Sequence, residues 1–251
     1  MAGENRRVAL ITGAAGGLGA AVVQLLASSG HDLALVDVRE EALAAVVSEL
    51  AGSGVSLETL PADLSNGSEC ERVVSETIER LGQVDILVNA AAILARRELE
   101  DVTAESFDEI FHINARAPFF LMRAAMRDMA RRNWGRIVNF TSIGVYQGGE
   151  KMTSAPYEAT KGAVSVFTKM FAKYGASQGV LVNAVCPGAM KTRMILEDTP
   201  PEILQAVSEA TPLKRIADPI EVARMVVWLC GDENSYATGA TFDIVGGWVM
   251  P

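Results

Sequence analysis

The stretch VALITGAAGGLGAAVVQLLASSG, residues 8–30, decides the fold. It begins with an apolar run at residues 8–11 that is typical of a buried strand, and it ends with a helical pattern of apolar residues at 20–29. Between them lies a glycine-rich turn. In such a unit the glycines allow the backbone to approach a pyrophosphate, and the N-terminus of the helix offers unpaired N–H groups. The stretch therefore predicts the first unit of a dinucleotide-binding fold.

The second predicted strand, residues 33–37, ends in a carboxylate. This residue, Asp37, follows Gly19 by 18 positions. An acidic side chain there accepts both ribose hydroxyls of an adenosine and repels a 2′-phosphate, which favours NAD over NADP. Arg39 argues weakly for NADP, because a nearby arginine can bind that phosphate.

The alternation of strand and helix continues to the end of the chain. Further strands are expected at residues 55–60, 86–89, 136–141, 181–185 and 240–245, and further helices at 40–50, 68–81, 106–132, 157–176 and 218–230. Pro118 should bend the long helix. The pattern predicts an α/β fold with a Rossmann-type, doubly wound parallel sheet of seven strands and helices on both faces. No linker or repeat divides residues 1–251, so we expect a single dinucleotide-binding and catalytic domain.

The composition limits which classes of binding partner and which cellular compartment are expected. The formal net charge of −9 argues against nucleic acid or an anionic membrane as a partner. No apolar run reaches the roughly 18 residues of a membrane span. The three cysteines lie far apart, which favours a reducing compartment, and we expect a cytoplasmic protein. His31 and His112 are too few and too scattered for a metal site, so no metal is expected.

The sequence YEATK, residues 157–161, carries the chemistry. Tyr157 and Lys161 are four residues apart and share one face of a helix, which Ser154 can cap and Pro156 can begin. The ammonium group of Lys161 should lower the pKa of the Tyr157 phenol. Tyr157 would then exchange protons with a ligand near neutral pH.

With these pieces in place, residues 7–248 resemble the short-chain dehydrogenase/reductase family, in its compact single-domain type. The motif TGxxxGxG at residues 12–19 is similar to the cofactor loop of the family, and NAVCPG at 183–188 is similar to its nicotinamide segment. The sequence VNAAA at 88–92 departs from the Asn-Asn-Ala-Gly pattern at Ala90 and Ala92. The resemblance implies that the cofactor is bound by Gly13, Gly17, Leu18, Gly19, Asp37, Asp63, Leu64, Asn89, Tyr157, Lys161, Pro187, Gly188 and Thr192.

The resemblance also implies a catalytic tetrad of Asn114, Ser142, Tyr157 and Lys161. Tyr157 would exchange the hydroxyl proton of the substrate, and Ser142 would donate a hydrogen bond to the same oxygen. Lys161 would also bind the nicotinamide ribose. Asn114 would hold a water molecule that links Lys161 to solvent.

The expected function is hydride transfer between NAD(H) and a secondary alcohol or ketone. A reductase of the 3-oxoacyl-carrier-protein type, using NADPH, is the alternative, and Asp37 argues against it. A non-catalytic nucleotide-binding protein is a further alternative, against which the intact tetrad argues. Members of the family are commonly homotetramers joined by their long helices and C-terminal strands, and we expect a homotetramer here.

The substrate pocket is less visible in the sequence. Residues 192–211, which include two adjacent prolines, are expected to form a lid. The 15 positions from Ser142 to Tyr157 form a longer loop than is usual in the family, and this length predicts a substrate with a second polar group. A solvated rim of little consequence is the alternative. The expected pocket residues are Ile93, Gly144, Gln147, Glu150, Lys151, Met190 and Met194.

Overall fold

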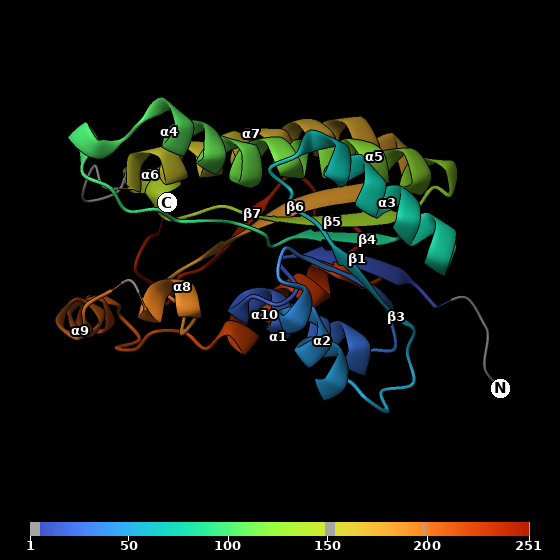
Figure 1. The fold of residues 1–251 in the computed structure, drawn as a ribbon, viewed down its shortest axis with the longest axis horizontal. Coiled ribbons are helices and arrows are strands. Elements are labelled where there is room, and N and C mark those ends of the chain that lie inside the picture. The colour runs from blue at the N-terminus through green and yellow to red at the C-terminus, as the bar shows by residue number, and fades with distance from the viewer. Residues whose placement is uncertain (1–5, 149–153, 198, 251) are drawn as a thin grey trace.

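The computed structural model describes residues 6–148, 154–197 and 199–250 (Figure 1). The strands are β1 (Val8–Thr12), β2 (Asp32–Asp37), β3 (Leu57–Pro61), β4 (Ile86–Asn89), β5 (Gly135–Phe140), β6 (Val180–Pro187) and β7 (Thr241–Ile244). The helices are α1 (Gly17–Ser28), α2 (Glu40–Glu49), α3 (Gly67–Leu81), α4 (Ala104–Phe111), α5 (Ala117–Arg131), α6 (Gly144–Gln147), α7 (Ala155–Gly175), α8 (Arg193–Leu196), α9 (Pro201–Ala210) and α10 (Pro219–Cys230).

The seven strands form one parallel sheet in the order β3-β2-β1-β4-β5-β6-β7. Helices α3, α5 and α7 cover one face, and α1, α2 and α10 cover the other (Figure 1). The predicted α/β fold class is confirmed. The chain reverses its winding direction between β1 and β4, and in sheets of this kind the ligand crevice lies there, beyond the carboxyl ends of the strands.

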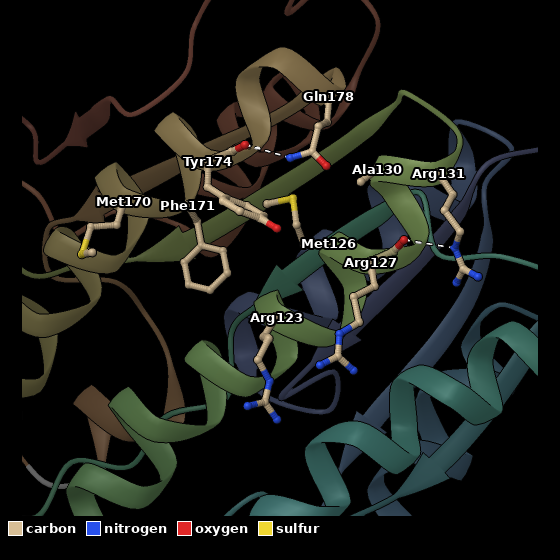
Figure 2. Close-up of a pocket in the computed structure, with 9 residues that line it drawn as sticks. All are labelled: Arg123, Met126, Arg127, Ala130, Arg131, Met170, Phe171, Tyr174 and Gln178. Atoms are coloured by element: carbon tan, nitrogen blue, oxygen red, sulfur yellow. Dashed lines mark hydrogen bonds between the residues drawn. The ribbon is translucent and has the colours of Figure 1, made fainter.

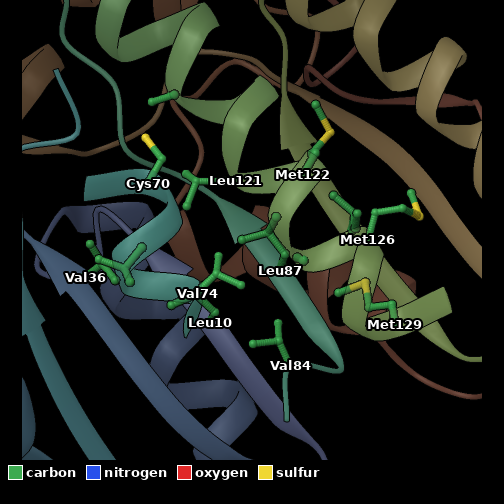
Figure 3. Packing of buried hydrophobic residues seen from close by; sticks show 14 of the residues in the cluster. Leu10, Val36, Cys70, Val74, Val84, Leu87, Leu121, Met122, Met126 and Met129 are labelled. Carbon is green, nitrogen blue, oxygen red and sulfur yellow. The ribbon is translucent and has the colours of Figure 1, made fainter. Parts of the chain in front are cut away.

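Alternate residues of each strand supply the two apolar cores. In β1, Leu10 packs under α3 and α5, while Ala9 and Ile11 pack against α1 and α10. Figure 3 shows the first core, in which Leu10 and Leu87 of the sheet meet Val74 of α3 and the methionines of α5. A sheet that is buried on both faces needs apolar side chains on both. This requirement explains why the strands appear in the sequence as continuous apolar runs.

The helix predicted at residues 106–132 is interrupted. A π-helical turn, His112–Arg116, separates α4 from α5, and the N–H of Ala117 bonds to the carbonyl of His112, five residues back. Pro118 has no N–H to offer the carbonyl of Asn114, four residues back, and its ring would crowd that carbonyl. The expected disturbance at Pro118 therefore takes the form of a π turn just before it.

The remaining differences concern helix ends and the expected lid. Ser154 occupies the N-cap position of α7, but its side chain makes no capping hydrogen bond, while Pro156 lies in the first turn as expected. Residues 192–211 contain two helices, α8 and α9, that the sequence pattern did not predict.

Candidate active site

The glycine-rich turn between β1 and α1 forms a cradle for an anion. Gly16 occupies the N-cap position of α1 without a side-chain cap, and the first turn holds no acidic residue, so its N–H groups remain available. Gly13 has φ = +65°, and a Cβ atom there would lie 2.8 Å from the backbone of Ala91. At Gly19 a Cβ atom would overlap the carbonyl oxygen of Gly13. The cradle therefore fits the pyrophosphate of a dinucleotide.

Asp37 lies at the end of β2, beside this cradle. Its carboxylate accepts a hydrogen bond from the backbone N–H of Ala15 (3.2 Å) and is only 8 % exposed. Arg39 pairs with it at 3.1 Å through Nε, with a guanidinium side chain that is 43 % exposed. Asp37, which favours NAD, and Arg39, which favours NADP, thus lie in direct contact.

Three more expected cofactor residues lie along the same edge of the sheet. Asp63 is exposed, and its carboxylate accepts a hydrogen bond from the N–H of Ser65, whereas the Leu64 side chain is buried in the core. Asn89 is buried, and its Nδ2 donates to the Asn139 side chain at 2.8 Å. Asn89 therefore ties β4 to β5, and a contact with the cofactor would have to come from the neighbouring backbone.

The segment after β6 closes the cradle from the other side. Pro187 is the last residue of β6, and the N–H of Gly188 bonds to the carbonyl of Ile244 on β7. Thr192 is buried, and a Cβ atom on Gly17 would lie 3.0 Å from its Cγ2. The two segments expected to hold opposite ends of the dinucleotide thus meet at Gly17 and Thr192.

Tyr157 and Lys161 lie on one face of α7, as their spacing predicts. The Nζ atom of Lys161 lies 5.4 Å from the centre of the Tyr157 ring and donates a hydrogen bond to the carbonyl of Phe140 at 3.1 Å. Burial lowers the pKa of Lys161 to about 8, and the charge of Glu158 opposes that shift. Lys161 is therefore a buried ammonium that loses its proton more easily than a surface lysine.

The predicted lowering of the Tyr157 pKa is wrong for this structure. Burial raises the pKa of the phenol, and the charges of Glu158 and Cys186 raise it further, while Arg96 opposes them. The spacing of four residues places Lys161 under the ring. Sequence reasoning identified the shared face and overlooked the cost of burying a phenolate.

Glu158 is the residue of this site that sequence reasoning missed. Its half-buried carboxylate lies against Gly144. Burial raises the pKa of Glu158, and the nearby Ser142 hydroxyl group and Lys161 oppose that shift. The Ser142 oxygen accepts a hydrogen bond from the N–H of Gly144 at 3.2 Å. The signal in the sequence was a single acidic residue between Tyr157 and Lys161.

Asn114 lies on the π turn, and both ends of its side-chain amide bond to the backbone of Ile93. Its Oδ1 accepts from the N–H of Ile93 at 2.9 Å, and its Nδ2 donates to the carbonyl of Ile93 at 2.8 Å. The amide therefore fixes the chain that follows β4. Through these bonds, Asn114 holds one side of the expected substrate pocket.

The other expected pocket residues occupy different surroundings. Gly144 begins α6 under the Glu158 carboxylate, and Gln147 ends α6 with an exposed side chain. Met194 is half-buried on α8, while Met190 packs against the core formed by α1 and α10. Glu150 and Lys151 lie outside the described residues.

A groove of about 790 Å³ lies away from this site, between α5 and α7 (Figure 2). Met170, Phe171 and Tyr174 of α7 line it opposite three arginines of α5. None of the expected catalytic or cofactor residues lines it, so the groove lies outside the candidate active site.

Neither a metal site nor a membrane-spanning helix is found among the described residues. Nowhere in them do three or more His, Cys, Asp or Glu side chains gather as a metal ion would require. The helices within these ranges are too short or too polar to span a bilayer.

Comparison with known proteins extends these observations to the whole chain. Residues 13–249 match the family model described as "Enoyl-(Acyl carrier protein) reductase". The chain is 32 % identical to the acetoacetyl-CoA reductase of Allochromatium vinosum, over 97 % of this chain and 99 % of that protein.

Solved structures show the same fold. A levodione reductase superposes with a TM-score of 0.90 at 31 % identity, over 96 % of both chains. A blue fluorescent protein from a metagenomic library, in complex with NADPH, gives 0.91 at 31 % identity, over 98 % of this chain and 99 % of that one. The chain therefore belongs to the short-chain dehydrogenase/reductase family, and it is an oxidoreductase with a nicotinamide dinucleotide as cofactor.

Proposed function

We propose that the enzyme transfers hydride between NAD(H) and a secondary alcohol or ketone at a site formed by Ser142, Tyr157, Lys161 and Asn114. The observation that carries the proposal is the placement of Tyr157 and Lys161 on one face of α7, with Ser142 after β5, at the edge of the sheet that holds the glycine cradle. When bound, the cofactor supplies or accepts the hydride. The glycine cradle and Thr192 would hold it beside these side chains.

Each side chain has a separate task in this proposal. Tyr157 takes the hydroxyl proton of an alcohol or returns it to a ketone, and Ser142 donates a hydrogen bond to the same oxygen. Lys161 places a positive charge beneath the Tyr157 ring, which favours phenolate against the opposing effect of burial. Because both ends of the Asn114 amide bind Ile93, its side chain keeps the pocket wall in place. The backbone carbonyl of Asn114, to which Pro118 offers no N–H, would hold the water molecule.

The substitution Tyr157→Phe tests this proposal. It removes the transferable proton and keeps the ring, so turnover should fall by about 100-fold or more while NADH affinity stays unchanged. Tyr236→Phe is the matched control, because Tyr236 is 97 % exposed. Turnover in Tyr157→Phe equal to that of the control would show that the tetrad is misassigned.

A preference for NAD over NADP is part of the proposal. Its support is the buried Asp37 carboxylate, fixed by Ala15 at the cradle, which would repel a 2′-phosphate. Arg39 weakens the repulsion, but its exposed guanidinium is screened by solvent. The direct measurement is the ratio of the dissociation constants for NADH and NADPH.

Reduction of a 3-oxoacyl thioester with NADPH is the second candidate. It is favoured by the contact of Arg39 with Asp37, and by the similarity to a relative whose name says that it reduces acetoacetyl-CoA. Acetoacetyl-CoA with NADPH should be assayed beside a panel of secondary alcohols with NAD. Faster turnover of acetoacetyl-CoA, with tighter binding of NADPH than of NADH, would favour this candidate over the first.

We also propose that residues 192–211 form a substrate lid. In addition, we propose that the loop after Ser142 binds a second polar group of the substrate. Support for the lid is the hydrogen bond between Arg96 and Thr199, which joins the chain after β4 to this segment. Support for the loop is the exposed Gln147 at the end of α6. Gln147→Ala should raise the KM for the alcohol and leave the KM for NAD unchanged.

For assembly, we propose a homotetramer in which the α5–α7 face that carries the groove of Figure 2 packs against the same face of a second copy. Val166, Met170 and Tyr174 recur every four residues on α7 and are 54 %, 63 % and 66 % exposed. Such a stripe on a long helix fits a self-complementary contact. The C-terminal segment, with Met250 84 % exposed, would form the second contact.

The three free, buried cysteines support a reducing compartment, and we infer that the protein is located in the cytoplasm.

A further inference from the structure

Arg116 joins the π turn that carries Asn114 to the loop that follows β3. Its guanidinium group donates a hydrogen bond to the backbone carbonyl of Ser65, which lies 51 positions away in the sequence. Two positions earlier on the same turn, the Asn114 amide bonds to the backbone of Ile93, after β4. One π turn thus holds two loops at the carboxyl edge of the sheet, and the proposed hydride transfer uses only the contact with Ile93.

The surroundings of Arg116 show a side chain that is held in one place. Arg116 and Ser65 are both half-buried. Among the described residues, the Nε atom of Arg116 has no hydrogen-bond partner, and it is shielded from solvent. A hydrogen bond from a charged donor is stronger than a neutral one, whereas a buried N–H without an acceptor is costly. An arginine that is held at this cost calls for a structural or functional reason.

Ser65 connects Arg116 to Asp63, one of the residues expected to bind the cofactor. The N–H of Ser65 donates to the Asp63 carboxylate at 2.9 Å, while the carbonyl of Ser65 accepts from Arg116. Between them, the buried Leu64 side chain packs in the core under α3 and α5. The place of the exposed Asp63 carboxylate therefore depends on Ser65, which Arg116 holds.

The chemistry of Asp63 identifies the part of a dinucleotide that it would meet. An ionised carboxylate only accepts hydrogen bonds. The ribose hydroxyl groups are expected at Asp37 and the nicotinamide at residues 183–188, which leaves the exocyclic amino group of adenine as the donor. The N–H of Ser65 bonds to Oδ1 of Asp63, so Oδ2 remains to accept from this amino group.

We propose that Arg116 is a positioning residue for the adenine end of the cofactor: by holding Ser65, it keeps the Asp63 carboxylate where the adenine amino group binds. The inference rests on the proposed function in placing the ribose at Asp37 and adenine at Asp63. A base without the amino group has no hydrogen bond to donate to this carboxylate. The contribution of Arg116 to binding therefore depends on the base.

Deamino-NADH, in which hypoxanthine replaces adenine, carries an oxygen in place of the amino group and is the probe for this contact. The wild type should bind NADH about tenfold more tightly than deamino-NADH, because only adenine donates to Asp63. Arg116→Met keeps the apolar stem and removes the hydrogen bond to Ser65. It should bind NADH about tenfold more weakly, with its affinity for deamino-NADH nearly unchanged, so the ratio of the two dissociation constants falls toward 1.

Three further variants accompany the methionine variant. Arg116→Gln is two atoms shorter than arginine and loses the reach to Ser65, so it should lower the ratio in the same way and serves if the methionine variant does not fold. Arg116→Lys keeps the charge and a donor, and it should restore part of the ratio. Arg224→Met, at an exposed position of α10, removes the same charge and should keep the ratio of the wild type.

Equal losses of affinity for NADH and deamino-NADH in Arg116→Met would overturn the proposal, since a merely structural arginine would weaken both alike and leave the ratio unchanged. A ratio of 1 in the wild type would overturn it too, because Asp63 would then not meet the amino group. The titrations need no substrate, and NADPH with its deamino form can replace NADH, since both cofactors contain adenine. If Tyr157→Phe behaves like its control, the proposed hydride transfer fails, and this ratio still decides the role of Arg116.

Discussion

Replacing Gly13 by alanine tests the cofactor cradle most sharply, because the chain contains a matched control. Gly13 and Gly30 both have a left-handed backbone, with φ of +65° and +81°. For an alanine this conformation costs about 1–2 kcal/mol at either position. At Gly30 a Cβ atom would meet nothing within 4 Å, whereas at Gly13 it would lie 2.8 Å from Cα and N of Ala91. The two variants share the backbone cost and differ in the clash.

The clash sets the size of the effect. Ordinary contact begins at 3.4 Å, so 2.8 Å requires a displacement of 0.6 Å (3.4 − 2.8) between two pieces of backbone. Overpacking of this kind costs about 1–3 kcal/mol. If the displacement breaks one hydrogen bond to the charged pyrophosphate, binding loses a further ~1.5–3 kcal/mol. Since 1.4 kcal/mol corresponds to tenfold in affinity, the Gly13→Ala variant should bind the dinucleotide about 10- to 100-fold more weakly.

Two measurements separate the contributions. Thermal melting without ligand should show a loss of about 2–8 °C for Gly30→Ala and a larger loss for Gly13→Ala. Titration with NADH, followed by fluorescence, should show weaker binding for Gly13→Ala alone. Equal NADH affinity in the two variants would refute the assignment of this turn as the pyrophosphate site.

Three further substitutions probe other parts of the molecule. Asp37→Ala should narrow the preference for NADH over NADPH, and Arg39→Ala should widen it, each by about fivefold, as expected for ~1 kcal/mol between charges in a solvated site; the measurement is the ratio of dissociation constants. Asn114→Ala removes both hydrogen bonds to Ile93 and should raise the KM for the alcohol about tenfold, with NADH affinity unchanged. Met170→Glu places a charge in the exposed stripe of α7 and should yield a smaller assembly by light scattering, while a tetramer that persists would locate the interface elsewhere.

The fold could be predicted from the sequence because burial on both faces leaves an unambiguous pattern. Every strand was expected within about two residues of its place. The π turn could not be predicted in the same way. An added residue within a turn disturbs the apolar period too little to be seen, and Pro118 marked only its neighbourhood.

The site was predicted in position but not in its electrostatics. The spacing of Tyr157 and Lys161 specifies a shared helix face, and the structure has it. The spacing does not show how deeply the Tyr157 side chain is buried. That burial determines whether desolvation or the neighbouring ammonium group controls the pKa of Tyr157. The contact of Glu158 with Gly144 could not be predicted for a related reason, since only tertiary packing brings α6 and α7 together there.

The pair of asparagines in the middle of the sheet affects how the chain folds. Asn89 and Asn139 lie opposite each other on β4 and β5, and the Asn139 side chain also donates to Thr168 at 2.9 Å. The neighbouring positions on both strands are almost uniformly apolar, so hydrophobic burial hardly distinguishes the native pairing from a shifted one. In a shifted pairing the two amides would be buried apart, and each unpaired amide costs about 1–3 kcal/mol. We therefore expect the bond between the two amides to favour the native alignment of the central strands while the chain folds, before any ligand is bound.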